Sequence, residues 1–221
     1  MKIEIWSDVI CPFCYIGKTQ LEAALAETGV KAEIEHRAFR LMPGETPYPI
    51  EEMFARRYGQ SPEQAKASMR NVEAMAADQG LEFHIPGTKA GDTTDAHRLL
   101  ILAGDRGVQI ELLNALYKAY FTDGRDVFDR DVLVAIAEKA GLDRAEAEKA
   151  LDSEELKARV AADQRTAETF GVRGVPFVVI DRKVAVSGAQ GTANFVKALR
   201  TAEPSPPADG ASCDINGCDP A

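Results

Sequence analysis

The stretch KIEIWSDVICPFCYIGK, residues 2–18, decides how the fold begins. Its first six residues alternate between polar and apolar side chains, which predicts a β-strand. Pro12 suits the first position of a helix and Gly29 suits its end, so residues 12–28 are predicted to be helical. Residues 31–39 (KAEIEHRAF) alternate again and predict a second strand. Strand, helix and strand in this order form a β-α-β unit, whose strands are normally parallel.

The pattern changes after a proline-rich break at residues 43–49 (PGETPYP). From about residue 50 to residue 168 almost every segment has helical features. Segments rich in β-formers return at residues 176–180 and 183–187, separated by two residues, which predicts an antiparallel hairpin. A helix over residues 191–200 follows. The sequence therefore predicts an α/β fold in the order β-α-β, helical insert, β-β-α.

This order divides the chain into three predicted parts. Residues 1–42 and 170–200 together supply the sheet and the helices next to it. Residues 43–169 form a large all-helical insertion domain. Residues 201–221 contain three prolines and a glycine before a second pair of cysteines, and we expect them to form an extended tail.

Composition and charge exclude several classes of protein. The chain has 221 residues and a net charge of −9, and an acidic surface repels phosphate backbones, so we expect no nucleic-acid partner. No apolar run approaches the roughly 18 residues that would span a bilayer, so we expect no membrane partner. The first residues lack the features of a secretory signal, and we expect a cytoplasmic protein. The sequence leaves the oligomeric state open.

Cys11 and Cys14 flank the start of the first predicted helix. Closely paired cysteines in a reducing compartment are more often catalytic or metal-binding than structural. The positive end of a helix dipole favours a thiolate, the species that attacks disulfides. The spacing predicts that Cys11 is the exposed nucleophile and Cys14 the shielded thiol that resolves the mixed disulfide, with Pro12 stiffening the turn. The alternatives are half of a zinc site or two inert cysteines.

A second motif, GVRGVPFVVI at residues 171–180, places Pro176 just before a predicted strand. Proline cannot donate to a sheet ladder, so it belongs at the first residue of the strand. A cis Val175–Pro176 bond would expose the backbone of Val175, which would then pair with an extended substrate near Cys11. The alternative is an ordinary proline that starts a strand.

These motifs together resemble the DsbA family of the thioredoxin superfamily, in particular its cytosolic FrnE-like branch of dithiol–disulfide isomerases. The resemblance rests on WSDVICPFCYIG (6–17), GVRGVPFVV (171–179), DAHRLL (95–100) and the helical insert, and it covers residues 1–200. It implies a thioredoxin fold, Cys11 as nucleophile, Cys14 as resolving thiol and Pro176 in cis. One departure from DsbA is Phe13, where that enzyme has a histidine that helps make it strongly oxidising, so the resemblance does not extend to a DsbA-like potential.

Several further side chains are candidates for a cleft beside the cysteines. Trp6, Phe13 and Tyr15 would form an apolar rim for unfolded segments, with Pro12 between them, although core packing is the alternative for Trp6. His97 lies one turn into a predicted helix, where it would line the cleft or pack as a hydrogen-bonded residue. The histidines are scattered and show no metal-ligand spacing, so we predict no metal site and no cofactor.

The second cysteine pair, Cys213 and Cys218, brackets an Asn-Gly tight-turn signal. A disulfide across so short a loop stabilises little, because the loop-closure term rises with length. We therefore predict a redox relay in which this pair exchanges with Cys11 and Cys14. The alternatives are an exposed or metal-binding tail, or one metal site shared by all four cysteines.

The leading functional hypothesis is a thiol–disulfide oxidoreductase or isomerase acting on protein disulfides. Its expected partners are disulfide-bonded proteins, with glutathione or thioredoxin-type dithiols as candidate reductants. A rival enzyme class has the same fold: kappa-type glutathione transferases and 2-hydroxychromene-2-carboxylate isomerases. These enzymes have a serine at the position of Cys11 and no resolving cysteine. A third hypothesis is a metal-binding or holdase protein.

Overall fold

A computed structural model describes residues 1–203. The chain opens with strand β1 (Lys2–Ser7), helix α1 (Pro12–Thr28) and strand β2 (Glu33–Ala38). β1 and β2 are parallel and pair over their full length, which confirms the predicted β-α-β unit. α1 ends at Gly29, whose left-handed φ of 68° lets its N–H cap the last turn.

The returning strands are β5 (Phe177–Ile180) and β6 (Val184–Ser187), and they complete a four-stranded sheet in the order β2-β1-β5-β6. β5 is antiparallel to both of its neighbours. Asp181 and Arg182 join β5 to β6 with φ values of 47° and 54°, as in a two-residue hairpin turn. The predicted hairpin is therefore confirmed.

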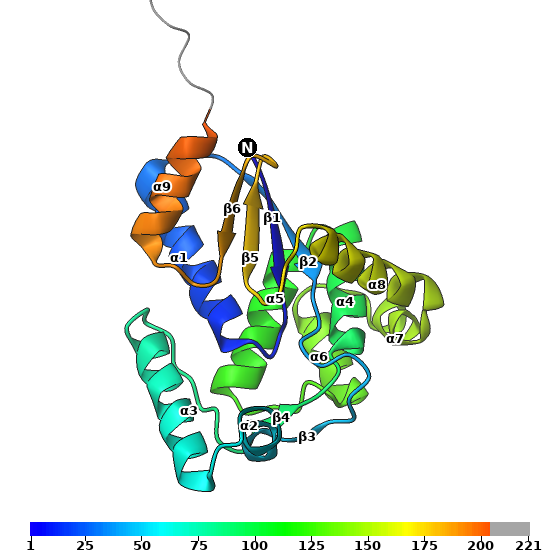
Figure 1. The fold of residues 1–221 in the computed structure, drawn as a ribbon. Helices are drawn as coiled ribbons and strands as arrows, with labels where there is room; N and C mark the ends of the chain where they lie inside the picture. The colour runs from blue at the N-terminus through cyan, green and yellow to red at the C-terminus, as the bar shows by residue number, and fades with distance from the viewer. Residues whose placement is uncertain (204–221) are drawn as a thin grey trace, which may run out of the picture.

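Helices α1 and α9 (Thr192–Ala202) cover one face of this sheet (Figure 1). The core between them is apolar and includes Ile3, Ile5, Leu21, Val178, Ile180, Phe195 and Leu199. Because α9 ends at Ala202, residues 201 and 202 are helical, whereas the sequence analysis assigned them to the tail.

A mostly helical segment lies between β2 and β5. Its helices are α2 (Ile50–Tyr58), α3 (Pro62–Ala77), α4 (Thr94–Asp105), α5 (Gln109–Tyr117), the π-helix η1 (Lys118–Thr122), α6 (Arg130–Lys139), α7 (Arg144–Asp152) and α8 (Glu154–Thr169). The segment also holds a short antiparallel pair, β3 (Tyr48–Pro49) and β4 (Lys89–Ala90). The insert is helical as predicted apart from this pair, which was not predicted because two-residue strands are too short to show an alternating pattern. The division of the chain into separate domains stays a prediction.

Helix α8 packs on the other face of the sheet, against β2. Trp6, Phe39 and Val179 form a small apolar cluster with Ala167 of α8. The last helix of the insert therefore shares a core with the sheet, and this packing brings α8 and the chain after it close to the end of β1.

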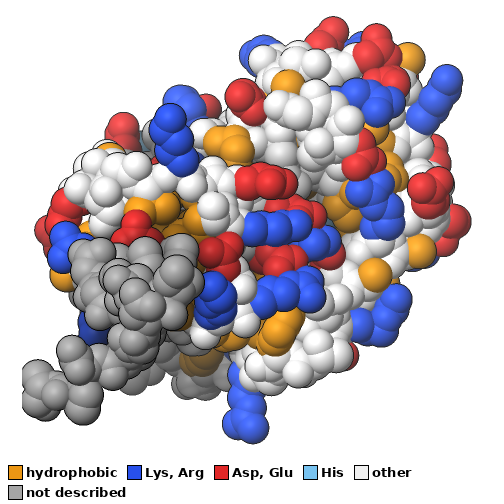
Figure 2. All heavy atoms as spheres, turned by 90° about the horizontal axis from the view of Figure 1, so that it is seen from above, with side chains coloured by type: hydrophobic (Ala, Val, Ile, Leu, Met, Phe, Trp, Pro, Cys, Tyr) orange, Lys and Arg blue, Asp and Glu red, His pale blue; other side chains and the backbone are white. Residues whose placement is uncertain are grey.

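The surface carries charges of both signs. Figure 2 shows Lys and Arg side chains interleaved with Asp and Glu side chains over the face that it displays. Ion pairs of this kind join Lys2 to Glu35 at 3.0 Å and Arg182 to Glu4 at 3.2 Å. The net charge of −9 is therefore not spread as a purely acidic surface over this face. In the described part of the chain, no helix is long and apolar enough to cross a membrane.

Candidate active site

The loop from β1 to α1 places the cysteine pair at the start of a helix. Cys11 is the N-cap residue of α1, with φ −88° and ψ 112°, and Pro12 is the first helical residue. The Cys11 N–H donates to the Asp8 carbonyl at 3.1 Å, and the Cys14 N–H donates to the Cys11 carbonyl at 3.0 Å. Both sulfurs therefore lie in the first turn, where the helix dipole favours a negative charge.

Cys11 is buried, although the sequence analysis predicted an exposed nucleophile. Only 4% of its surface is exposed, and its Sγ donates to the Val175 carbonyl at 3.5 Å. The loop before β5, which covers Cys11, comes from a part of the chain 164 residues away. The neighbouring Phe13 is 38% exposed and marks the open side of the pair.

Cys14 lies one turn deeper and is 2% exposed, in line with the expected shielding. Burial raises the pKa of its thiol well above the usual value, and the hydrogen bond and charge of Cys11 act in the same direction. A hydrogen bond from the Asp8 backbone acts in the opposite direction. Cys14 therefore holds its proton at neutral pH.

The Val175–Pro176 bond is cis, as the resemblance implies. Gly17, in the second turn of α1, lies directly against this loop. A Cβ built on Gly17 would come within 2.9 Å of Pro176 Cγ, which is closer than real Cβ contacts allow. Sequence reasoning missed this role, although Gly17 is part of the opening motif. The close approach of α1 to the loop brings Cys11 next to Val175.

The aromatic residues around the pair separate into core and surface. Trp6 is fully buried; its Nε1 donates to the Asp163 carbonyl at 3.0 Å, and its ring packs on Phe170 and Phe177. Of the two possibilities for Trp6, the rim of a cleft or core packing, the structure shows core packing, because α8 and the chain after it cover the ring. Tyr15 is partly buried and stacks on Tyr117, with ring centroids 4.8 Å apart. Phe13 alone of the three predicted rim aromatics is exposed.

His97 does not line an open cleft. It is 2% exposed, and its Nε2 lies 3.5 Å from Oδ1 of Asp8, which is itself fully buried. Sequence reasoning missed Asp8, and the available signal was an acidic residue inside an otherwise apolar loop before Cys11. The structure thus brings Asp8 and His97 together behind the cysteine pair.

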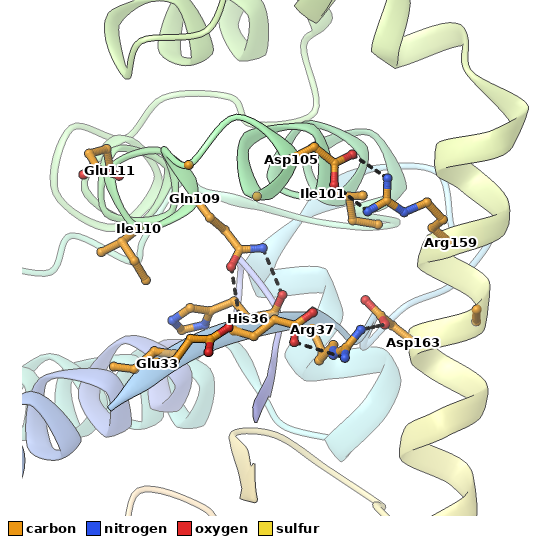
Figure 3. A pocket seen from close by; sticks show the side chains of 15 residues that line it. Glu33, His36, Arg37, Ile101, Asp105, Gln109, Ile110, Glu111, Arg159 and Asp163 are labelled. Carbon is orange, nitrogen blue, oxygen red and sulfur yellow. Dashed lines mark hydrogen bonds and ion pairs between the residues drawn. The ribbon is translucent and has the colours of Figure 1, made fainter. Parts of the chain in front are cut away.

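A cavity of about 630 Å³ lies away from the cysteines, beside β2. Figure 3 shows Arg159 paired with Asp105, and Arg37 paired with Asp163, among the side chains that line it. The side-chain amide of Gln109 bonds both the N–H and the carbonyl of His36, at 3.0 and 3.1 Å. The cavity thus lies along a strand edge already covered by side chains, and neither cysteine lines it.

Residues 1–203 bring no three His, Cys, Asp or Glu side chains together in a group that could hold a metal ion. Cys213 and Cys218 lie outside the described residues, so both the predicted relay and the predicted metal alternative stay predictions for them.

A dithiol at the first turn of α1, facing a cis-proline loop in a mixed sheet, defines the thioredoxin class of folds. The DSBA-like thioredoxin domain family matches residues 2–200, and the chain belongs to that family. A probable DsbA oxidoreductase from Streptomyces coelicolor is 40% identical, with a TM-score of 0.87 over 100% of this chain and 99% of that one. Family membership supports a general role in thiol–disulfide chemistry.

Two other solved structures share the fold at low identity. The cytosolic disulfide reductase DsbM from Pseudomonas aeruginosa, solved with GSH, is 19% identical with a TM-score of 0.65, covering 91% of this chain and 98% of its own. A 2-hydroxychromene-2-carboxylate isomerase is 17% identical with a TM-score of 0.67, covering 91% and 95%. At these identities the similarity concerns the fold alone.

Proposed function

We propose that the chain is a dithiol–disulfide oxidoreductase that reduces or isomerises disulfides in proteins. The observation that carries the proposal is the placement of Cys11 Sγ, 3.5 Å from the Val175 carbonyl and one helical turn from Cys14. In this arrangement one sulfur faces the loop to which a substrate would bind. The other sulfur is positioned to displace the substrate.

The reaction proceeds in two exchanges. The Cys11 thiolate attacks one sulfur of the substrate disulfide, the S–S bond breaks, and the other substrate sulfur leaves as a thiolate. Cys14, as a thiolate, then attacks the Cys11 sulfur, which forms the Cys11–Cys14 disulfide and releases the second substrate thiolate. Two electrons have passed from the pair to the substrate. An external thiol, glutathione or a thioredoxin-type dithiol, returns them.

The burial of Cys11 gives the cis-proline loop a second role in substrate binding. In the described structure the Val175 carbonyl accepts the hydrogen bond of the Cys11 thiol. An extended substrate that pairs with the backbone of Val175 competes for that carbonyl and releases the sulfur for attack. Phe13, exposed on the open side, offers an apolar contact to unfolded segments.

We propose that reduction and isomerisation, rather than net oxidation, are the working directions. Phe13 stands where DsbA has a histidine, a residue that makes that enzyme strongly oxidising. A site with a potential near about −120 mV would be almost wholly reduced by a glutathione pool at about −220 to −320 mV. A dithiol held reduced donates electrons to wrong disulfides.

Insulin reduction and recovery of scrambled ribonuclease test this function. We expect wild type and Cys213→Ser to turn over in both assays, whereas Cys11→Ser loses at least about 1,000-fold because the nucleophile is gone. Full activity of the Cys11→Ser variant would refute the proposal.

The chain shares its fold with a 2-hydroxychromene-2-carboxylate isomerase. This similarity motivates a second candidate function, that of a kappa-type glutathione transferase or a 2-hydroxychromene-2-carboxylate isomerase. Those enzymes act through a serine at the position of Cys11 and have no resolving cysteine, whereas this chain has both thiols. Tight glutathione binding with no insulin reduction would favour this candidate over the first.

We further propose that Cys213 and Cys218 exchange with Cys11 and Cys14, on the basis of their spacing in the sequence. A Cys213→Ser/Cys218→Ser double variant should turn over more slowly than wild type with at least one physiological reductant. Unchanged turnover with glutathione and with thioredoxin-type reductants would refute the proposed exchange between the two cysteine pairs.

A further inference from the structure

The cavity beside β2 has the size of a small-molecule site. Its volume is about 630 Å³, and pockets that bind small ligands measure roughly 300 to 1,000 Å³. Its walls come from β2, from α4 and α5 with the turn between them, and from α8 (Figure 3). Neither Cys11 nor Cys14 lines it, so a ligand in this cavity would leave the dithiol free.

Gln109 fixes the wall of the cavity along the strand edge. Its side-chain amide bonds the N–H and the carbonyl of His36 at 3.0 and 3.1 Å, and it also donates to the Leu100 carbonyl at 3.2 Å. Gly104 leaves room for this amide, because a Cβ at position 104 would lie 3.2 Å from Gln109 Nε2. This wall is therefore held in place before a ligand binds, which lowers the entropic cost of binding.

The two arginines that line the cavity already have partners. Arg159 donates to Asp105 at 2.8 Å, and Arg37 lies 3.3 Å from Asp163. All four residues line the cavity, so both guanidinium charges are compensated within it. The cavity therefore does not favour an anionic ligand such as a phosphate or a carboxylate.

The other acidic side chains give the cavity a surplus of negative charge. Five carboxylate side chains line it, against the two guanidinium groups. Glu33 on β2 and Glu111 on α5 are exposed, and within residues 1–203 no ion pair holds either of them. Figure 3 shows them on opposite sides of Ile110. Two separate negative charges on two walls favour a ligand with two cationic groups.

His36 offers the cavity a polar atom that has no partner. It is 7% exposed, and Figure 3 shows its ring on the side of β2 that faces Ile110. Within residues 1–203 its buried Nδ1 has no hydrogen-bond partner. Burial lowers the pKa of His36 to about 3, so the ring is neutral at pH 7 and can accept a hydrogen bond. An unpaired buried acceptor costs free energy, and an ammonium donor beside the ring would satisfy it.

The lining between these polar groups is aliphatic. It includes Ile34 on β2, Ile101 on α4, Ile110 on α5 and Ala162 on α8. Burying methylene groups against such side chains is favourable. The cavity thus suits a chain of methylene groups that carries a positive charge at each end.

We propose that this cavity binds an aliphatic polyamine. Its ammonium groups pair with Glu33 and Glu111 and donate to the His36 ring, and its methylene chain packs on Ile34 and Ile110. The ligand binds without forming a covalent bond. The proposal is independent of the disulfide chemistry proposed above, because it rests on a cavity that the cysteines do not line.

Titration calorimetry of the full-length chain with spermidine at low ionic strength tests the proposal. Wild type should bind one equivalent. Glu33→Gln/Glu111→Gln should weaken binding about tenfold, because two charge pairs are lost. The matched control, Glu27→Gln/Glu168→Gln, removes two exposed carboxylates from α1 and α8 outside the cavity. It changes the net charge equally and should bind as wild type does.

Ile110→Trp fills the cavity without changing its charge, and it should weaken binding at least about tenfold. Circular dichroism checks that this variant is folded. Butylamine, which has one ammonium group, should bind at least about tenfold more weakly than spermidine, because it cannot reach both carboxylates.

Equal weakening in the two double variants would overturn the proposal, since it would show a general attraction of cations to an acidic protein. Wild-type binding by folded Ile110→Trp, or equal binding of butylamine and spermidine, would also overturn it. Tighter binding of a lysine-rich peptide than of spermidine would assign the cavity to a polypeptide instead. Cys11→Ser should bind spermidine as wild type does, so a failure of the disulfide chemistry would be distinguishable from a failure of this site.

Discussion

The two sides of the cysteine pair differ in what surrounds each sulfur. On the open side, Cys11 contacts a backbone carbonyl of the cis-proline loop, and Phe13 beside it is exposed. On the rear side, Cys14 is enclosed near stacked aromatic rings and the Asp8–His97 pair. The open side can admit a substrate, whereas the rear side keeps the Cys14 thiol buried and protonated. One helical turn thus separates two chemical tasks.

When the Cys11 nucleophile is kept, the largest effect should come from changing the rear sulfur. Cys14→Ser should lower steady-state insulin reduction by about 100-fold or more, because release of the mixed disulfide then depends on an external thiol instead of a positioned one. The first attack by Cys11 should keep its rate, measured as burst release of one substrate thiolate. Equal loss of both steps would contradict the separation of tasks.

His36 is a buried residue without a cysteine nearby. Its substitution should therefore affect stability and not catalysis. Burial, with the charge of Lys18, lowers the pKa of His36 to about 3. The unfolded chain, with a histidine pKa of about 6.5, binds more protons between these values, so stability falls as pH falls through that window. Between pH 7.5 and 5.0 the loss should be about 2 kcal/mol, and His36→Gln should remove it.

Urea unfolding of wild type and His36→Gln at both pH values measures this difference. Parallel stability profiles for the two proteins would show that His36 does not hold the lowered pKa. Oxidoreductase activity at pH 7.5 should be the same for both proteins.

The close approach of helix α1 to the cis-proline loop depends on Gly17. Gly17→Ala places a methyl group 2.9 Å from Pro176 Cγ, so the cis-proline loop must shift. We expect kcat/KM for protein disulfides to fall about tenfold, since a misplacement on the order of 1 Å is costly in a positioned reaction. Reduction of a small aromatic disulfide should fall less, because it does not need the backbone of Val175. Equal losses for both substrates would contradict a role in spacing.

The smallest effect should come from substituting Phe13, the exposed aromatic residue beside Cys11. Phe13→Ala removes a partly exposed ring that we expect to contact unfolded segments, and KM for insulin should rise about threefold with kcat unchanged. The matched control is Tyr58→Ala, which removes an exposed aromatic side chain from α2. If both variants raise KM equally, the rim has no special role.

The sequence predicted local structure well where local signals set it. Pro12 and Gly29 mark the ends of α1, and both ends are confirmed. Alternation predicted β1, and two segments of β-forming residues separated by two residues predicted the β5–β6 hairpin. The pair β3–β4 escaped prediction because two residues cannot show a period.

The burial of the site residues could not be predicted, because it depends on segments distant in sequence. Cys11 is covered by a loop 164 residues away, and the Nε1 of Trp6 donates to Asp163, 157 residues away. Asp8 and Gly17 were missed for the same reason. Each lies in the opening motif, but its role appears only when α4 or the cis-proline loop arrives beside it.

Trapping the mixed disulfide tests the central claim most directly. A Cys14→Ser variant, with Cys213→Ser and Cys218→Ser, is mixed with a peptide disulfide and mapped by mass spectrometry. We predict one peptide half attached to Cys11, and no adduct when Cys11→Ser is made in the same background. A protein that reduces the peptide with no adduct at Cys11, or that forms an adduct only at Cys14 when both thiols are present, would contradict the account.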